Sequence, residues 1–139
     1  DRPVPADGAL LRAATHVAFS SDALADYTGI DEPARALAEA ARSLAGWCCV
    51  TAGRAGVHVL ARGQSSHCAA FDVPVVDTLG AGDVWHGAFA LALAEGRDEV
   101  VAVRIASAAA ALKVQRAGGR AGAPTRAELE SFLAAQSAA

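Results

Sequence analysis

The stretch Asp77–Asp83 holds the residue types in this chain that are best suited to chemistry. Its small residues Gly80, Ala81 and Gly82 lie between a segment expected to be extended and an expected apolar helix. Glycine lets backbone N–H groups approach a ligand closely, and a helix N-terminus offers free N–H donors and the positive end of a dipole. The pattern therefore predicts a binding site for an anion such as phosphate.

Asp83 falls in the first turn of that expected helix, next to the predicted anion site. A carboxylate in this place is suited to taking a proton from a hydroxyl group beside a phosphate, which is general base catalysis. In the alternative interpretation, the glycines only form a loop and Asp83 only interacts with the helix dipole. Small-residue turns before helices are common in α/β proteins, so the spacing alone leaves both interpretations open.

The string Asp77–Asp83 followed by an apolar helix resembles the C-terminal signature of the ribokinase (pfkB) family of carbohydrate kinases. The resemblance implies that Asp83 is the catalytic base and that Gly80, Ala81 and Gly82 contact the phosphates of ATP. It also implies Mg²⁺ as a cofactor, a sugar as the acceptor and a homodimer in the intact enzyme. The implied fold is a ribokinase-like layered α/β/α fold with a mainly parallel sheet. Residues 1–139 are expected to form a single α/β domain, the C-terminal, nucleotide-binding portion of a longer enzyme.

A second candidate site is the segment Thr51–Gly56, which follows an expected apolar strand. Its glycines Gly53 and Gly56 and the Thr51 hydroxyl are suited to presenting donors to phosphate. A hairpin turn that needs positive φ explains the same residues equally well, and Arg54 fits an exposed loop cation as well as a phosphate ligand. The segment resembles the Thr-x-Gly-x-x-Gly element of the family, which implies that it contacts the nucleotide.

A third stretch, residues 103–119, combines an alanine-rich helix with a glycine-containing loop. Close helix packing explains the alanines without any ligand. The resemblance implies that Ser107 contacts the nucleotide base. It further implies a site for a monovalent cation such as K⁺, in which most ligands are backbone carbonyls. The positions implied for that cation are Asp77, Leu79, Lys113, Arg116, Gly118 and Gly122, of which Gly122 departs from the family because it has no side-chain oxygen.

One family element is missing upstream. Many members carry Asn-x-x-Glu before a Thr-Gly pair, but here Ser20 and Ala23 occupy the corresponding positions before Thr28-Gly29. This change, together with His86 after the signature, resembles the ketohexokinase and sulfofructose kinase branches more than ribokinase itself. The missing acid also keeps open a second hypothesis, a nucleotide-binding or regulatory module that has the fold without the chemistry.

The elements that must position these residues follow from periodicity and capping patterns. Strands are expected at 16–20, 47–51, 57–61 and 66–71, with an extended segment at 73–76. A short helix should end at Gly29, and Asp31 should cap the next one, with Pro33 in its first turn. Two long helices are expected at 81–95 and 98–115, and the capping box Thr125–Glu128 should open a last helix.

The composition narrows the classes of partner. Twelve basic residues against 15 acidic residues leave no basic patch for nucleic acid. No apolar run approaches the ~18 residues of a membrane-spanning helix, so no membrane partner is expected. Three cysteines without metal-ligand spacing favour neither a disulfide framework nor a zinc site, and they indicate a reducing, cytoplasmic location. The pattern does not identify the sugar.

Overall fold

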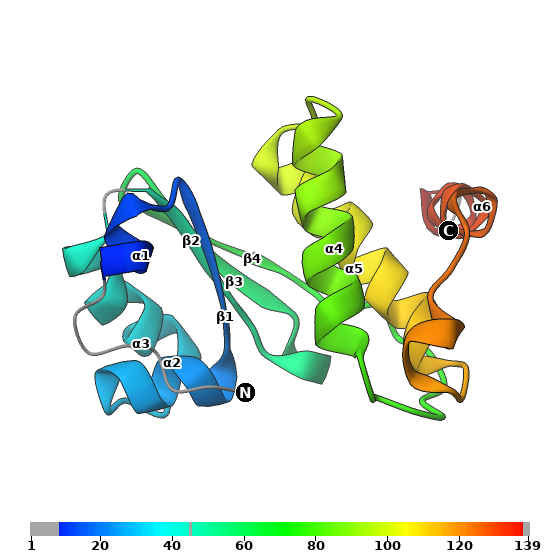
Figure 1. Ribbon diagram of the computed structural model, residues 1–139, viewed down its shortest axis with the longest axis horizontal. Coiled ribbons are helices and arrows are strands. Elements are labelled where there is room, and N and C mark those ends of the chain that lie inside the picture. The colour runs from blue at the N-terminus through cyan, green and yellow to red at the C-terminus, as the bar shows by residue number, and fades with distance from the viewer. Residues whose placement is uncertain (1–8, 45, 138–139) are drawn as a thin grey trace. The chain divides into compact units, whose positions relative to one another are not determined.

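The computed structural model describes residues 9–44 and 46–137 (Figure 1). The chain divides into two compact units, Asp1–Ala69 and Ala70–Ala139. The expectation of one domain over residues 1–139 stays a prediction. The elements of the first unit are α1 (Ala9–Ala13), β1 (His16–Ser20), α2 (Ser21–Thr28), α3 (Pro33–Ala40), η1 (Ala41–Ser43), β2 (Trp47–Thr51), η2 (Gly53–Ala55), β3 (Val57–Ala61) and β4 (Gln64–Cys68). Those of the second are α4 (Ala81–Ala94), α5 (Glu99–Val114), η3 (Gly119–Gly122) and α6 (Arg126–Ser137).

The four strands of the first unit form one sheet in the order β1-β2-β3-β4. Strands β1 and β2 are parallel, whereas β2–β3 and β3–β4 are antiparallel pairs. The expectation of a mainly parallel sheet is therefore wrong for the strands described here. The reason lies in the connections. Helices α2 and α3 provide the long crossover that a parallel pair needs, but only short turns follow β2 and β3, and short turns join antiparallel neighbours.

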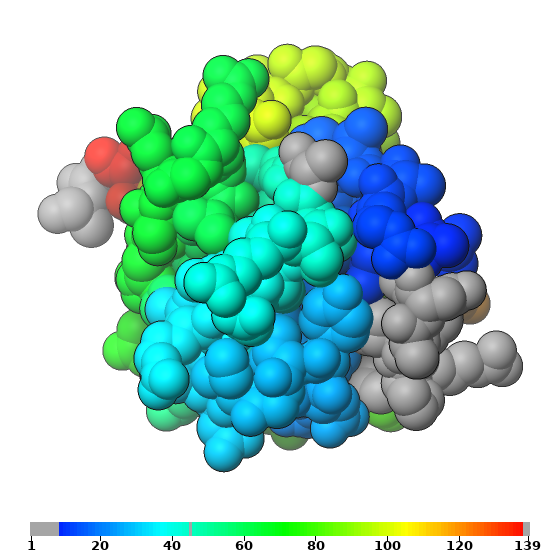
Figure 2. All heavy atoms as spheres, turned by 90° about the vertical axis from the view of Figure 1, so that its left-hand side faces the viewer, coloured from blue at the N-terminus to red at the C-terminus, as the bar shows by residue number. Residues whose placement is uncertain are grey.

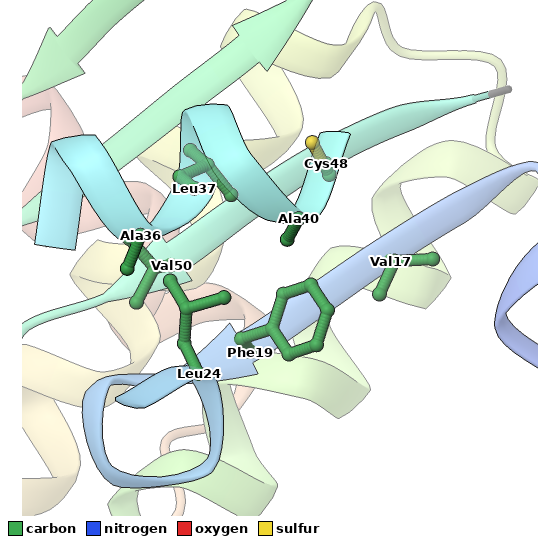
Figure 3. Close-up of a cluster of buried hydrophobic side chains, with 8 residues drawn as sticks. All are labelled: Val17, Phe19, Leu24, Ala36, Leu37, Ala40, Cys48 and Val50. Atoms are coloured by element: carbon green, nitrogen blue, oxygen red, sulfur yellow. The ribbon is translucent and has the colours of Figure 1, made fainter. Parts of the chain in front are cut away.

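The core of the first unit lies between the sheet and helices α2 and α3. Alternate residues of β1 point to these helices, as the buried Val17 and Phe19 show. They pack with Leu24 of α2, Leu37 of α3 and Val50 of β2 (Figure 3). In the space-filling view, α2 and α3 form a closed surface in blue to cyan (Figure 2). Burial of these apolar side chains holds the βαβ portion of the unit together.

Capping residues set the ends of the two helices. The Ser20 hydroxyl accepts a hydrogen bond from the N–H of Ala23 at 3.2 Å, and Gly29 ends α2 with a φ of 70°. Helix α3 begins with Pro33, but the expectation that Asp31 caps it is wrong. Glu32 is the cap. Its carboxylate accepts hydrogen bonds from the N–H groups of Ala34 and Arg35, the first two residues after Pro33, which has no N–H group of its own.

All the regular elements described in the second unit are helices. Trp85 and Phe89 of α4 are buried and stacked, with ring centroids 5.1 Å apart. Helix α6 packs Phe132 edge-on against Phe71, at 5.2 Å between centroids. The predicted capping box at the start of α6 is confirmed, because Thr125 and Glu128 exchange hydrogen bonds. Among the described residues, none of the helices is both long and apolar enough to cross a membrane.

The segment 73–76 before the signature is not part of the sheet, although it was expected to be extended. Pro74 has no N–H group for a strand ladder. The chain is instead tied to the end of α5, where the carbonyl oxygen of Val114 accepts hydrogen bonds from Val76 N at 2.7 Å and Asp77 N at 3.1 Å. The C-terminal end of α5 therefore sets where the signature begins.

Candidate active site

Helix α4 begins with an N-terminus that no side chain caps. Gly80 is its N-cap residue, with a φ of 77° and no side-chain hydrogen bond to the first turn. The first N–H groups of a helix have no partner within the helix, so Gly82 and Asp83 direct theirs beyond it. Both residues are exposed, and a Cβ built on Gly82 would meet no atom within 4 Å. The predicted features of an anion site are present, and Asp83 lies in the first turn as predicted.

The side chain of Asp77 fixes the loop that leads to this helix. Its Oδ1 accepts a hydrogen bond from Leu79 N at 2.9 Å, and its Oδ2 accepts bonds from the N–H groups of Gly118 and Gly119, both at 3.2 Å. The bond from Leu79, followed by those from Gly119 and Lys113, lowers the pKa of Asp77 to about 2. The carboxylate thus joins the signature loop to the loop after α5.

The ammonium group of Lys113 adds to this junction from the last turn of α5. Its side chain is fully buried, and Nζ donates to the Asp77 carbonyl oxygen at 2.7 Å. The same Nζ lies 3.2 Å from Asp77 Oδ2. A buried charge needs a charged or strongly polar partner, and Asp77 provides both a carboxylate and a carbonyl oxygen. Main chain and side chain of Asp77 are therefore both held by Lys113.

The other positions implied for a monovalent cation lie around the same junction. A Cβ on Gly122 would lie 3.3 Å from the Arg116 carbonyl oxygen and 3.5 Å from that of Lys113, so these backbones converge. The Leu79 side chain lies against Gly119, where a Cβ would come within 3.5 Å of it. The Arg116 guanidinium is directed elsewhere and pairs with Glu128 at 2.6 Å.

Ser107 lies on α5 and is half-buried. Its hydroxyl accepts a hydrogen bond from the indole Nε1 of Trp85 at 3.2 Å, which links α5 to α4. The family resemblance implies a contact of Ser107 with the nucleotide base, and the bond to Trp85 was not predicted from the sequence. Trp85 follows Asp83 by two positions on the signature helix, so the Ser107 hydroxyl is tied to the helix that bears the predicted base.

In the first unit, the segment Thr51–Gly56 forms a tight turn between β2 and β3. Gly53 and Gly56 have φ values of 54° and 88°, which only glycine adopts readily. Ala52 N donates to Gly56 O at 2.8 Å, and Gly53 and Arg54 are exposed at the tip. The Thr51 hydroxyl donates to the Phe19 carbonyl oxygen at 3.3 Å, so it connects β2 to β1. The predicted turn is therefore present, with Gly53 and Arg54 exposed at its tip. The Thr51 hydroxyl and the N–H group of Gly56, which donates to Gly53 O at 3.1 Å, already have partners within the protein.

Two side-chain roles in the second unit were not predicted from the sequence, the hydrogen bond of the Trp85 indole to Ser107 and the contact of the Lys113 ammonium with Asp77. The sequence did contain one signal for Lys113. It is the only lysine of the chain, and it follows a run of alanines, which is typical of a buried helix face rather than of an exposed charged one. Within the described ranges, no group of three or more His, Cys, Asp or Glu side chains could hold a metal ion.

Residues 4–126 match the pfkB family carbohydrate kinase profile. The chain belongs to this family. A ribokinase from Bacillus subtilis is 45% identical over 84 residues, which cover 60% of this chain and 29% of the ribokinase. The prediction from the signature is thereby confirmed at the level of the family, whereas the branch within it stays a prediction.

Solved structures support the ribokinase-like fold. The Arabidopsis thaliana ribokinase in complex with ribose and ATP is 28% identical, with a TM-score of 0.84 over 95% of this chain and 44% of that one. A double mutant of the Vibrio cholerae fructokinase with fructose, ADP and a potassium ion is 26% identical, with a TM-score of 0.81 over 89% of this chain and 42% of that one. The chain thus spans less than half the length of these relatives.

Proposed function

We propose that the whole protein transfers the terminal phosphoryl group of ATP to a hydroxyl group of a sugar. The observation that carries this proposal is the exposed carboxylate of Asp83 in the first turn of α4, beside N–H groups that no side chain caps. Family membership supports it, because the names of the relatives are those of sugar kinases. That the acceptor is a sugar is inferred from the family, and the homodimer and the cytoplasmic location of the whole protein are further proposals.

In the proposed reaction, Asp83 accepts the proton of the sugar hydroxyl as that oxygen attacks phosphorus. The backbone N–H groups of Gly80 and Gly82 stabilise negative charge on the phosphoryl oxygens, whereas that of Ala81 donates to the Thr78 carbonyl oxygen at 3.1 Å. Phosphoryl transfer depends mainly on positioning and charge stabilisation, which preorganised N–H donors supply. Asp77 contributes by holding the loop in this conformation through its bonds to Leu79, Gly118 and Gly119.

Each unit is proposed to contribute its own residues to ATP binding. In the first unit these are Thr51, Gly53, Arg54 and Gly56, whose turn exposes backbone donors and a guanidinium. In the second they are the signature loop and the half-buried Ser107 of α5. Mg²⁺ bound with ATP would neutralise phosphate charge.

A second candidate function is nucleotide binding without transfer. It is favoured by Ser20 and Ala23, which replace the family's Asn-x-x-Glu element. The Ser20 hydroxyl caps α2, and Ala23 supplies only the N–H group in that bond. The two positions that correspond to Asn-x-x-Glu therefore form a helix cap in this chain.

The two functions are separated by incubating the whole protein with ATP, Mg²⁺ and single sugars, and by identifying the products by mass spectrometry. Transfer predicts a sugar phosphate formed in equal amount to ADP with at least one pentose or ketose. Binding alone predicts saturable ATP binding, measured by calorimetry, with no sugar phosphate from any sugar. ATP hydrolysis without a phosphorylated sugar would contradict the proposed transfer.

A further inference from the structure

The Lys113 ammonium lies at the junction where the family resemblance implies a monovalent cation. Its Nζ is 2.7 Å from the carbonyl oxygen of Asp77 and 3.2 Å from Oδ2 of the same residue. These are the kinds of oxygen that would ligate K⁺, and one relative of known structure was solved with a potassium ion. Lys113 therefore places a positive charge of the chain itself against the implied ligands.

The residues of this junction do not fit a potassium ion. The carboxylate of Asp77 already accepts bonds from three N–H groups in addition to the ammonium. Gly122, at the position implied for a side-chain ligand, has no side-chain oxygen to offer. A second cation at Asp77 would lie beside a fully buried ammonium, and like charges repel strongly where water is excluded.

We propose that Lys113 replaces the monovalent cation of its relatives and holds the phosphate-binding loop in its active conformation without K⁺. Two successive contacts connect Lys113 to the phosphate-binding loop. Lys113 holds the main chain and the carboxylate of Asp77, and Asp77 holds Leu79, next to the N-cap Gly80. Lys113 is thus a positioning residue for the loop, and it touches no substrate. The expected effect on kcat/KM rests on the proposed function, whereas the expected effect on the melting temperature does not.

The test compares potassium chloride with tetramethylammonium chloride at equal ionic strength, with two readouts on the whole protein. The first is the melting temperature, and the second is kcat/KM for the sugar. For the unchanged protein, we expect the melting temperature to agree within about 1 °C between the two salts and kcat/KM to be the same. A melting temperature or a rate that rises with K⁺ in the unchanged protein would overturn the proposal.

Two substitutions make the test specific. Lys113→Ala removes the charge and opens room for an ion, so K⁺ or methylammonium should raise kcat/KM by about five- to tenfold and the melting temperature by about 4 °C. Lys113→Met removes the charge but fills the space, so neither ion should help it. A merely structural lysine would give variants that respond alike to every salt, and that result would contradict the proposal.

The exposed Arg97 on the loop between α4 and α5 provides the control, because Arg97→Met removes a positive charge of the same unit away from the junction. It should behave as the unchanged protein in both salts. If Lys113→Ala does not fold, the unchanged protein and Lys113→Met still decide the question. If no sugar is phosphorylated, the proposed function fails, while the melting temperatures continue to support or overturn the role of Lys113.

Discussion

The indole Nε1 of Trp85 donates a hydrogen bond to the Ser107 hydroxyl at 3.2 Å, and this bond joins the signature helix α4 to its neighbour α5. Trp85 is only 4% exposed, so its N–H group has little access to water as an alternative partner. The contact holds the first turns of α4 against a fixed surface of α5.

Ser107→Ala should lower the free energy of unfolding by about 1–3 kcal/mol, because it leaves the buried N–H of Trp85 without its partner. The measurement is urea unfolding of the single variants Ser107→Ala and Trp85→Phe and of the double variant. The double-mutant cycle should give a coupling of about 0.5–1.5 kcal/mol. Strictly additive effects would show that the bond does not form in solution.

Asp83→Asn should lower kcat of the whole protein by about 10²- to 10⁴-fold, because the amide cannot accept the proton of the sugar hydroxyl. ATP affinity should change little, since the N–H groups of the loop remain. Glu99→Gln is the matched control, an acid in the first turn of α5, and its kcat should be unchanged. An Asp83→Asn protein with near-normal kcat would show that Asp83 is not the base.

Gly80→Ala and Gly87→Ala should have opposite effects on stability. Gly80 has a φ of 77°, so Ala there should cost about 1–2 kcal/mol of the free energy of unfolding. Gly87 lies inside α4 with no atom within 4 Å of a built Cβ, so Ala should stabilise by about 0.5–1 kcal/mol. Thermal unfolding measures both, and equal effects of the two substitutions would contradict the described loop.

Glu128 should make stability depend on pH. Hydrogen bonds from Arg116 and then from Thr125 lower the pKa of Glu128 from 4.5 to about 2. Because the folded value lies below the unfolded one, the stabilisation is complete above about pH 4.5 and is lost as the pH falls towards 2. Urea unfolding of Glu128→Gln should therefore differ from the unchanged protein at neutral pH and converge with it in acid.

The matched control for this pH dependence is Glu130→Gln, an exposed carboxylate on the same helix. Its effect on the free energy of unfolding should stay small at every pH. A difference between Glu128→Gln and the unchanged protein that grows as the pH falls would have the wrong sign for a lowered pKa.

Local patterns predicted much of the fold. The expected strands at 16–20, 47–51 and 57–61 are β1, β2 and β3, because continuous or alternating apolar residues mark them. The last strand was placed too late in the sequence. Arg62 and Gly63 have φ values of 50° and 76°, which form a tight turn and start β4 at Gln64. An arginine at positive φ is uncommon, so the sequence offered little signal for this turn.

The candidate site, too, has features that neighbouring residues predict and features that depend on residues far apart in the sequence. The uncapped start of α4 and the position of Asp83 follow from neighbouring residues, and both predictions agree with the structure. The contact between Lys113 and Asp77 joins residues 36 positions apart. Whether the ammonium group is buried or exposed depends on how α5 packs against the signature loop. Sequence spacing supplied the two positions through the family resemblance, but the direction of the side chain required the folded chain.

The burial of Lys113 has a consequence for chemical labelling. It is the only lysine of this chain, and its side chain is fully buried. Amine-directed acylating reagents can reach it only when the contact between the signature loop and α5 opens. The rate at which Lys113 becomes acylated therefore measures how often this contact opens. Bound nucleotide that keeps the loop closed should slow the labelling, so a single modified residue reports on the ligand.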